Sequence, residues 1–218
     1  MYTVRDLYSL NHTQAGEYLQ GFSYPWQALE GLKAFILSLG EGLDEKQYDK
    51  VGEGIWIHKS AQIASTAFIA APCIIGENTE VRPSAYIRGS VLVGKGCVVG
   101  NSTELKNCIL FDGVQVPHYN YVGDSILGYK AHLGAGAITS NVKSDKTLVV
   151  IKSPTECVPT ERKKVGAFLG DNVEVGCNSV LNPGTVIGKN SRVYPLSCVR
   201  GVIEENCIYK QSGIVKIR

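Results

Sequence analysis

The chain has 218 residues, enough for one sizeable hydrophobic core or for one domain with a small appendage. Its 22 basic residues nearly balance its 20 acidic ones, which excludes a broad basic surface for nucleic acid or for an anionic membrane. Any anion-binding site must therefore be local.

The opening residues resemble no targeting signal. The start, "MYTVRDLYSLNH", has neither the basic opening nor the apolar stretch of a secretory signal. The chain also lacks the run of about 18 apolar residues that a membrane-spanning helix requires. We therefore expect a cytoplasmic protein with no membrane partner.

Residues 1–50 are predicted to form a helical N-terminal cap. In the stretch "SYPWQALEGLKAFILSLGEG", Pro25 suits a first helical turn and Gly40 can end the helix. Apolar residues recur between them at helical spacing, at Leu29, Leu32, Ile36 and Leu39. We expect this segment to pack on the open first coil of the following domain. A platform for a partner or for substrate is the alternative.

Residues 51–218 carry an apolar residue at every sixth position over two long stretches. The series comprises Ile57, Ile63, Ile69, Ile75, Val81, Ile87, Val93, Val99, Leu105 and Phe111, then Leu169, Val175, Leu181, Ile187, Val193 and Val199. A period of six fits short parallel strands joined by tight turns, with three strands closing a triangular coil of about 18 residues. We therefore predict an all-β solenoid. Its interior ladder should include Ile57, Ile75, Val93 and Phe111.

Glycine often follows the repeated apolar residue. The examples are Gly76, Gly94, Gly100, Gly128, Gly134, Gly170, Gly176 and Gly188. Glycine leaves the backbone free to turn where a side chain would obstruct it. We expect these residues to lie at tight turns.

His118 lies where the period shifts. Counting in sixes back from the later repeats reaches Tyr121, whereas counting forward from the earlier repeats reaches Pro117, so the two phases differ by two residues. The shift should present His118, Asn120 and Tyr121 at an irregular corner. An imidazole with the ordinary pKa of about 6.5 can accept a proton at neutral pH. His118 is thus a candidate general base, and a structural, hydrogen-bonded histidine is the alternative.

The period is absent over residues 142–166. This stretch has a strand-like core, "TLVVIK", two prolines, and a basic end formed by Arg162, Lys163 and Lys164. It is predicted to leave the solenoid and return to it. A loop of this length is either solvated surface or a place where a site is built.

The seven cysteines and four histidines do not indicate a metal site. The cysteines are scattered without a CxxC pair, and we expect them to be small reduced core residues. No two histidines have metal-ligand spacing. We therefore expect no bound metal.

Hexapeptides such as "VGKGCV" and "IGKNSR" resemble those of the hexapeptide-repeat acyltransferases. Residues 100–141 are similar to the acetyltransferase half of bifunctional N-acetylglucosamine-1-phosphate uridyltransferases and to the β-helical half of archaeal sugar-1-phosphate nucleotidylyltransferases. The E-x-K, H-x-x-Y-x-G-D and G-A-G-x-x-x-x-N elements stand in family order, within a resemblance that covers residues 57–210. It implies a left-handed parallel β-helix, a handedness that the spacing alone does not fix.

The resemblance also implies roles for individual residues. His118 would take a proton from the nitrogen of an amino sugar as that nitrogen attacks acetyl-CoA. The residues that match contacts to the sugar and its phosphate are Arg88, Lys106, Tyr121, Asn141 and Lys146, and those that match contacts to acetyl-CoA are Ala135 and Arg200. The family's trimers place the active site between subunits, so the resemblance implies a homotrimer.

Two departures from the family pattern matter. His132 stands where the bifunctional enzymes usually have asparagine, which puts the contact there in doubt. The nucleotidylyltransferase half of those enzymes has no counterpart in this sequence, so pyrophosphorylase activity is not expected.

The leading hypothesis is an acyltransferase that moves an acetyl group from acetyl-CoA to the amine of an amino-sugar phosphate or nucleotide sugar. The alternative is a non-catalytic solenoid that binds a sugar nucleotide or a protein and has lost its partner domain. A hexapeptide-fold carbonic anhydrase would need three metal-binding histidines, and the histidines at hand argue against it.

Overall fold

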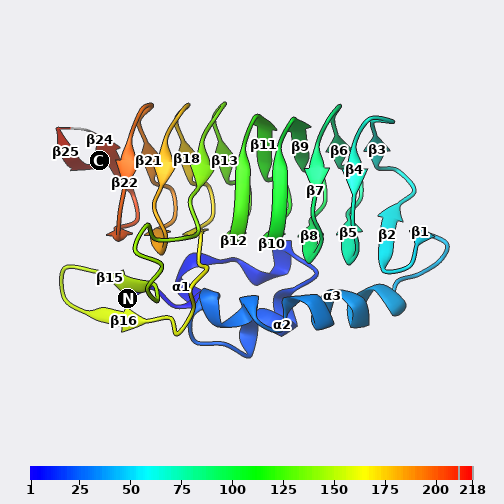
Figure 1. The fold of residues 1–218 in the computed structure, drawn as a ribbon, viewed down its shortest axis with the longest axis horizontal. Coiled ribbons are helices and arrows are strands. Elements are labelled where there is room, and N and C mark those ends of the chain that lie inside the picture. The colour runs from blue at the N-terminus through cyan, green and yellow to red at the C-terminus, as the bar shows by residue number, and fades with distance from the viewer. Residues whose placement is uncertain (211, 218) are drawn as a thin grey trace.

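The computed structural model describes residues 1–210 and 212–217, and most of it is a β-solenoid whose coils follow one another along a single axis (Figure 1). The predicted solenoid is thus confirmed. Neighbouring coils pair through parallel strands, and antiparallel pairs occur between β1 (Tyr48–Gly52) and β2 (Ile55–His58) at one end and between β24 (Cys207–Lys210) and β25 (Gly213–Lys216) at the other.

The solenoid has three faces. Face 1 comprises β2, β5 (Cys73–Ile75), β8 (Val91–Val93), the ends of β10 (Glu104–Leu110) and β12 (Tyr121–Leu127), β17 (Ala167–Leu169), β20 (Thr185–Ile187) and β23 (Val202–Ile203). Face 2 comprises β3 (Gln62–Ile63), β6 (Glu80–Val81), β9 (Val98–Asn101), β11 (Gln115–His118), β13 (His132–Leu133), β18 (Glu174–Val175), β21 (Arg192–Val193) and β24. Face 3 comprises β4 (Phe68–Ile69), β7 (Tyr86–Ile87), the starts of β10 and β12, β14 (Ile138–Thr139), β19 (Val180–Leu181) and β22 (Cys198–Val199).

The interior ladder of face 1 follows the prediction at first and then departs from it. Ile57, Ile75 and Val93 stand opposite one another, but Val93 pairs with Leu110 rather than with Phe111. The reason is that β10 continues without a break from face 3 into face 1. This coil is therefore one residue shorter than the predicted 18. Phe111 instead packs against Tyr8 of the N-terminal segment, with the ring centroids 5.0 Å apart.

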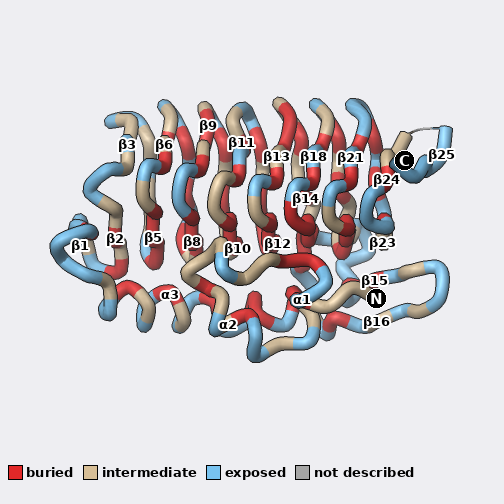
Figure 2. Tube along the Cα trace, turned by 180° about the vertical axis from the view of Figure 1, so that it is seen from behind, coloured by how far each residue is buried: buried red, intermediate tan, exposed pale blue. Residues whose placement is uncertain are grey.

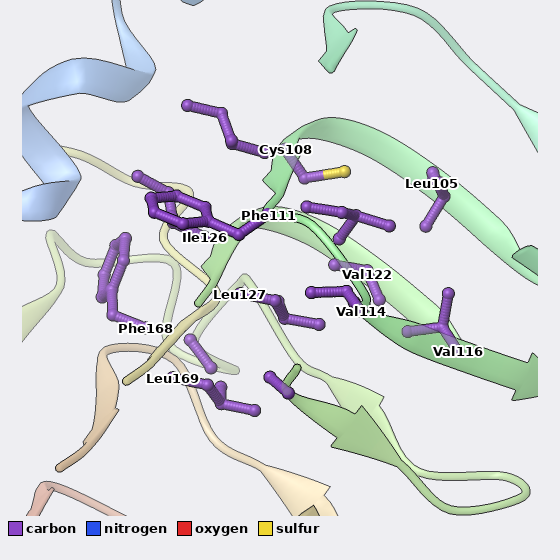
Figure 3. Packing of buried hydrophobic residues seen from close by; sticks show 14 of the residues in the cluster. Leu105, Cys108, Phe111, Val114, Val116, Val122, Ile126, Leu127, Phe168 and Leu169 are labelled. Atoms are coloured by element: carbon purple, nitrogen blue, oxygen red, sulfur yellow. The ribbon is translucent and has the colours of Figure 1, made fainter. Parts of the chain in front are cut away.

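A second shortening occurs in β12, where the next interior position after Leu110 is Leu127. The two single-residue shortenings together produce the two-residue phase shift seen in the sequence. They lie in β10 and β12 and not at His118, whose own strand is in regular register with Asn101. The predicted location of the shift was therefore wrong. In Figure 3, the Leu127 side chain lies inside the coil, whereas the Phe111 side chain lies on the side of the N-terminal helix.

The N-terminal segment lies along face 1 instead of over the first coil (Figures 1 and 2). Its helices are α1 (Val4–Leu7), η1 (Leu10–His12), α2 (Gly16–Gln20), η2 (Pro25–Leu29) and α3 (Leu32–Glu41). At one end Gly40 packs on the Trp56 ring of the first complete coil, and at the other the Glu205 amide donates to the Tyr2 hydroxyl over 2.8 Å. Face 1 strands such as β5, β8 and β17 are consequently buried on both sides.

The single helix expected between Pro25 and Gly40 is in fact two elements. The chain forms the 3-10 helix η2, passes through Gly31, and then forms α3. Gly40 lies inside α3, where any side chain would collide with Trp56, and the helix ends at Glu41 with Gly42 as its C-cap. No helix in the described ranges is long and apolar enough to cross a membrane.

The glycines that follow the repeated apolar residues are required for a different reason from the predicted one. None of them has a positive φ; each corner instead places another residue, often Asn or Ser, in the left-handed region. A Cβ on Gly94 would lie 2.7 Å from the Asp112 amide nitrogen of the next coil, and one on Gly100 would overlap the Pro117 carbonyl. These glycines allow adjacent coils to approach closely.

Residues 142–166 leave the solenoid as a β-hairpin of β15 (Val150–Lys152) and β16 (Cys157–Pro159), which lies beside the N-terminal segment (Figure 1). The excursion closes where the Val165 amide donates to the Asn141 carbonyl over 3.0 Å.

Among the cysteines, four are buried as expected, whereas Cys157, Cys177 and Cys198 are exposed, so the prediction of core residues was wrong for those three.

We predict that Gly100→Ala destabilises the protein by about 2 kcal/mol or more, because its methyl group would force two coils apart. Urea unfolding followed by circular dichroism measures the change. Gly42→Ala is the matched control, since a Cβ there meets only ordinary contacts and the φ of −94° suits alanine. It should change the free energy of unfolding by no more than about 0.5 kcal/mol. Equal effects of the two variants would contradict the close-packing explanation.

Candidate functional site

Face 3 presents two outward rows of side chains. The strand register aligns Phe68, Tyr86, Glu104, Tyr121, Ile138, Val180 and Cys198 in the first row. Because side chains alternate along a strand, the second row lies two positions later and comprises Ala70, Arg88, Lys106, Gly123, Ser140, Asn182 and Arg200. The fold thereby places Arg88, Lys106, Tyr121 and Arg200 on one face.

A buried carboxylate joins three of the predicted substrate-binding residues. The Asp124 side chain, only 3% exposed, forms an ion pair with Lys106 at 3.1 Å. It also accepts hydrogen bonds from the amides of Asn107 at 2.8 Å and Asn141 at 2.6 Å, and Asn141 donates further to the Tyr121 hydroxyl at 3.1 Å. We call these five residues the Asp124 cluster. It fixes the positions of Lys106, Tyr121 and Asn141 relative to one another.

The shortened coils explain why this cluster forms. Asn107 and Asp124 both take the left-handed conformation, with φ of 48° and 49°, at the corners where β10 and β12 continue from face 3 into face 1. They stand one coil apart, so their side chains meet across the usual spacing between strands of about 4.8 Å. Sequence reasoning did not single out Asp124, although it ends the quoted H-x-x-Y-x-G-D element.

Tyr121 crosses the face to reach Asn141. Its ring lies over Gly123, where a Cβ would come within 2.7 Å of the ring carbon that carries the hydroxyl, so glycine is needed at that position. Burial, together with the negative charges of Asp124 and Glu104, raises the pKa of the Tyr121 phenol above its usual value. The hydroxyl therefore stays protonated at neutral pH and can donate to a ligand.

Arg88 lies next to Lys106 in the second row and is more exposed. Its guanidinium donates to the Glu104 carboxylate over 2.7 Å, which raises the pKa of Arg88 further. The guanidinium carbon also lies 5.9 Å from the centre of the Tyr86 ring. The pair with Glu104 is open to solvent, so an incoming phosphate can approach the same cation.

His118 lies at the corner between faces 2 and 3. Its backbone amide donates to the Asn120 side chain over 3.1 Å, and Asn120 in turn donates to the carbonyls of Gly134 and Ala137. Asn120 is thus buried and holds the corner, and the expectation that it faces outward was wrong. The His118 side chain is exposed, and its imidazole has no hydrogen-bond partner among residues 1–210 and 212–217. The ring is open to contact with a ligand.

Ala135 lies directly beyond His118 in the next coil, since the Gly136 amide donates to the His118 carbonyl over 3.0 Å. The Ala135 carbonyl accepts from Asn178, whereas its amide donates to no acceptor in the described part of the chain. This N–H is therefore available to a ligand beside His118.

The other predicted residues lie outside the Asp124 cluster. Arg200 is four coils from Lys106 along the second row, about 19 Å at the usual strand spacing. Lys146 is exposed in a turn of the excursion, where its amide donates to Lys143 over 3.0 Å. His132 lies on face 2, opposite Gln115 and Glu174 of the neighbouring coils.

A protein-family model described as the GMPPB C-terminal domain matches residues 69–187. The chain belongs to this family. The match supports the predicted recognition of a hexapeptide-repeat acyltransferase domain. The family segment contains His118, the Asp124 cluster and Arg88, but it ends before Arg200.

Two curated relatives each match part of the chain. The chain is 34% identical over 91 residues to the bifunctional sugar-1-phosphate nucleotidylyltransferase/acetyltransferase of Sulfurisphaera tokodaii. This match covers 42% of the chain and 23% of the relative. It is 36% identical over 112 residues to the bifunctional protein GlmU of Methanococcus maripaludis, and this match covers 51% of the chain and 27% of GlmU. The chain thus spans about a quarter of the length of these relatives.

Among solved structures, the polySia-specific acetyltransferase NeuO is 12% identical with a TM-score of 0.44, and the match covers 72% of this chain and 82% of NeuO. AntD, an N-acyltransferase from Bacillus cereus in complex with dTDP and 3-hydroxybutyryl-CoA, is 21% identical with a TM-score of 0.35 over 82% and 86%.

We predict that Asp124→Ala lowers the free energy of unfolding by about 3 kcal/mol, because it leaves the Lys106 ammonium and two amides without their buried acceptor. Glu104→Ala is the control, since the Glu104–Arg88 pair is open to solvent and an exposed ion pair contributes little to stability. Denaturant unfolding of both variants measures the two changes in the free energy of unfolding. A loss at Asp124 no larger than at Glu104 would show that the cluster does not organise the face.

Proposed function

We propose that the protein is a CoA-dependent acyltransferase that transfers an acetyl group from acetyl-CoA to the amine of an amino-sugar phosphate or nucleotide sugar. The observation that carries the proposal is the exposed imidazole of His118 at the edge of face 3, which has no hydrogen-bond partner among residues 1–210 and 212–217. The same face carries Lys106 and Arg88, each held by a carboxylate. Membership of the family and relatives named as acetyltransferases support it.

His118 is the general base of the proposed reaction. The acceptor nitrogen forms a bond to the thioester carbonyl carbon while the imidazole takes the proton that the nitrogen loses. The carbon–sulfur bond then breaks, and the CoA sulfur leaves with the electron pair and receives a proton. The Ala135 amide, one coil beyond His118 and without an acceptor among the described residues, would hold the acyl-CoA arm by a hydrogen bond.

The acceptor lies along face 3. Tyr121 and Asn141 contact the sugar, because their donors are held side by side next to the Asp124 carboxylate. Lys106 and Arg88 contact the phosphate, for which charge-assisted hydrogen bonds suit both cations. Lys146 would reach this phosphate from the excursion, and Arg200 would meet the phosphates of CoA further along the solenoid.

Subunits of a homotrimer complete the site in this proposal. The N-terminal segment covers face 1, so faces 2 and 3 are the surfaces that remain for packing against other copies. A non-catalytic sugar-nucleotide-binding solenoid would use the same face 3 residues, but it would not need an exposed histidine at its edge.

We predict that His118→Ala lowers the rate of acetyl transfer by about 100-fold or more, because removal of a general base typically costs that much. Release of free thiol from acetyl-CoA, measured with a panel of amino-sugar phosphates and their nucleotide derivatives, reports the reaction. His58→Ala, on the first coil, removes a partly exposed histidine and should leave the rate unchanged. Thiol release that survives His118→Ala, or its absence with every acceptor, would refute the proposal.

We predict that Arg88→Gln raises the KM for the acceptor about 10-fold and leaves the KM for acetyl-CoA unchanged, because only the acceptor phosphate meets this cation. Arg82→Gln is the matched control, since Arg82 lies on face 2 in a comparable exposed pair with Glu80 at 3.1 Å. Steady-state kinetics with each substrate varied separately gives both constants. An equal rise in both KM values for Arg88→Gln would argue against a phosphate contact.

A further inference from the structure

Two aromatic side chains on face 3 are left exposed. Phe68 is 60% exposed and Tyr86 45% exposed, on consecutive coils, and their ring centroids lie 5.6 Å apart at an interplanar angle of 56°. Large aromatic rings are usually buried, and a pair presented together on a rigid strand surface commonly marks a binding site. No function assigned above uses this pair.

The pair continues the row that begins at the Asp124 cluster. Phe68, Tyr86, Glu104 and Tyr121 are consecutive members of the first row of face 3. At the usual strand spacing, Tyr86 lies two coils or about 10 Å from Tyr121, and Phe68 lies about 14 Å from it. A ligand that extends from Tyr121 toward the start of the solenoid therefore reaches the aromatic pair.

Cations occupy the space between the two ends of this path. Lys106 and Arg88 are consecutive members of the adjoining second row, and the Arg88 guanidinium carbon is 5.9 Å from the centre of the Tyr86 ring. The next member of that row is Ala70, whose small side chain leaves the surface beside Phe68 open. Coil by coil from Tyr121, face 3 presents hydroxyl and amide donors, then Lys106 beside Glu104, then Arg88 beside Tyr86, and last Phe68.

We infer that Phe68 and Tyr86 form the stacking surface for the nucleobase of the acceptor, so that the acceptor class is a nucleoside-diphosphate amino sugar rather than an amino-sugar monophosphate. The inference rests on the proposed function, whose acceptor site it extends. The sugar lies at Tyr121, the two phosphates lie against Lys106 and Arg88, and the base lies on the aromatic pair. This order is the order of the groups in a nucleotide sugar.

Stacking on aromatic side chains accepts any base, because every base has a π face. The surface therefore selects for the presence of a nucleoside and not for one particular base. Phe68 and Tyr86 point outward and do not fill the interior of the solenoid. Recognition of a nucleoside would explain why both rings are exposed.

Direct binding tests the inference without turnover. Calorimetric titration of the full chain with UDP and with inorganic pyrophosphate should show UDP binding at least about 10-fold more tightly, because stacking adds to the phosphate contacts. Phe68→Ala and Tyr86→Ala should each weaken UDP binding by roughly 10- to 100-fold and leave pyrophosphate binding unchanged. Tyr194→Ala, which removes a tyrosine of similar exposure from face 2, should alter neither.

Kinetics and solution mass separate the possible outcomes. If the inference holds, Phe68→Ala raises the KM for a UDP-linked amino sugar and not for the corresponding amino-sugar 1-phosphate. Equal binding of UDP and pyrophosphate overturns it, as does a change in oligomeric mass on Phe68→Ala, which would show that the pair contacts another copy of the chain. Acetylation of the sugar phosphate without UDP binding would uphold the proposed function and overturn this inference. If the protein binds UDP, loses this binding on Phe68→Ala and releases no thiol with any acceptor, the inference holds and the proposed function is overturned.

Discussion

Stacking of one coil's backbone on the next is the constraint on which the rest of this structure depends. Each strand must pair with its neighbour about 4.8 Å away, so residues separated by one coil are brought into contact although they are distant in sequence. Lys106 and Asp124 meet in this way. The same constraint excludes side chains at positions such as Gly94 and Gly100, where the next coil leaves no room.

Small departures from the regular coil create the chemistry of face 3. Two coils are shortened by one residue, and the corners so formed turn Asn107 and Asp124 toward each other. Asp124 then accepts from Asn141 and pairs with Lys106, which orders donors and a cation on an otherwise repetitive surface. The regular part of the repeat provides rigidity, and the irregular part provides a site.

The covering of face 1 directs function to the other two faces. The N-terminal segment and the β15–β16 hairpin bury the outward side chains of that face, including Phe168 against Trp26 with ring centroids 5.9 Å apart. His118 at the corner between faces 2 and 3 remains exposed. Phe68 and Tyr86 extend the exposed surface along face 3, from the Asp124 cluster toward the first coils.

The six-residue period by itself determined that the chain is a solenoid, because apolar side chains must recur wherever three short strands close a coil. Motif order likewise identified His118, Lys106, Tyr121 and Asn141 as a candidate set. Only the tertiary structure decided that Leu110 and not Phe111 continues the ladder, that Asn120 is buried, and that Asp124 joins the set. The physical reason is that the sequence shows the sum of two shortened coils but not the corners at which they occur, and those corners decide which side chains meet.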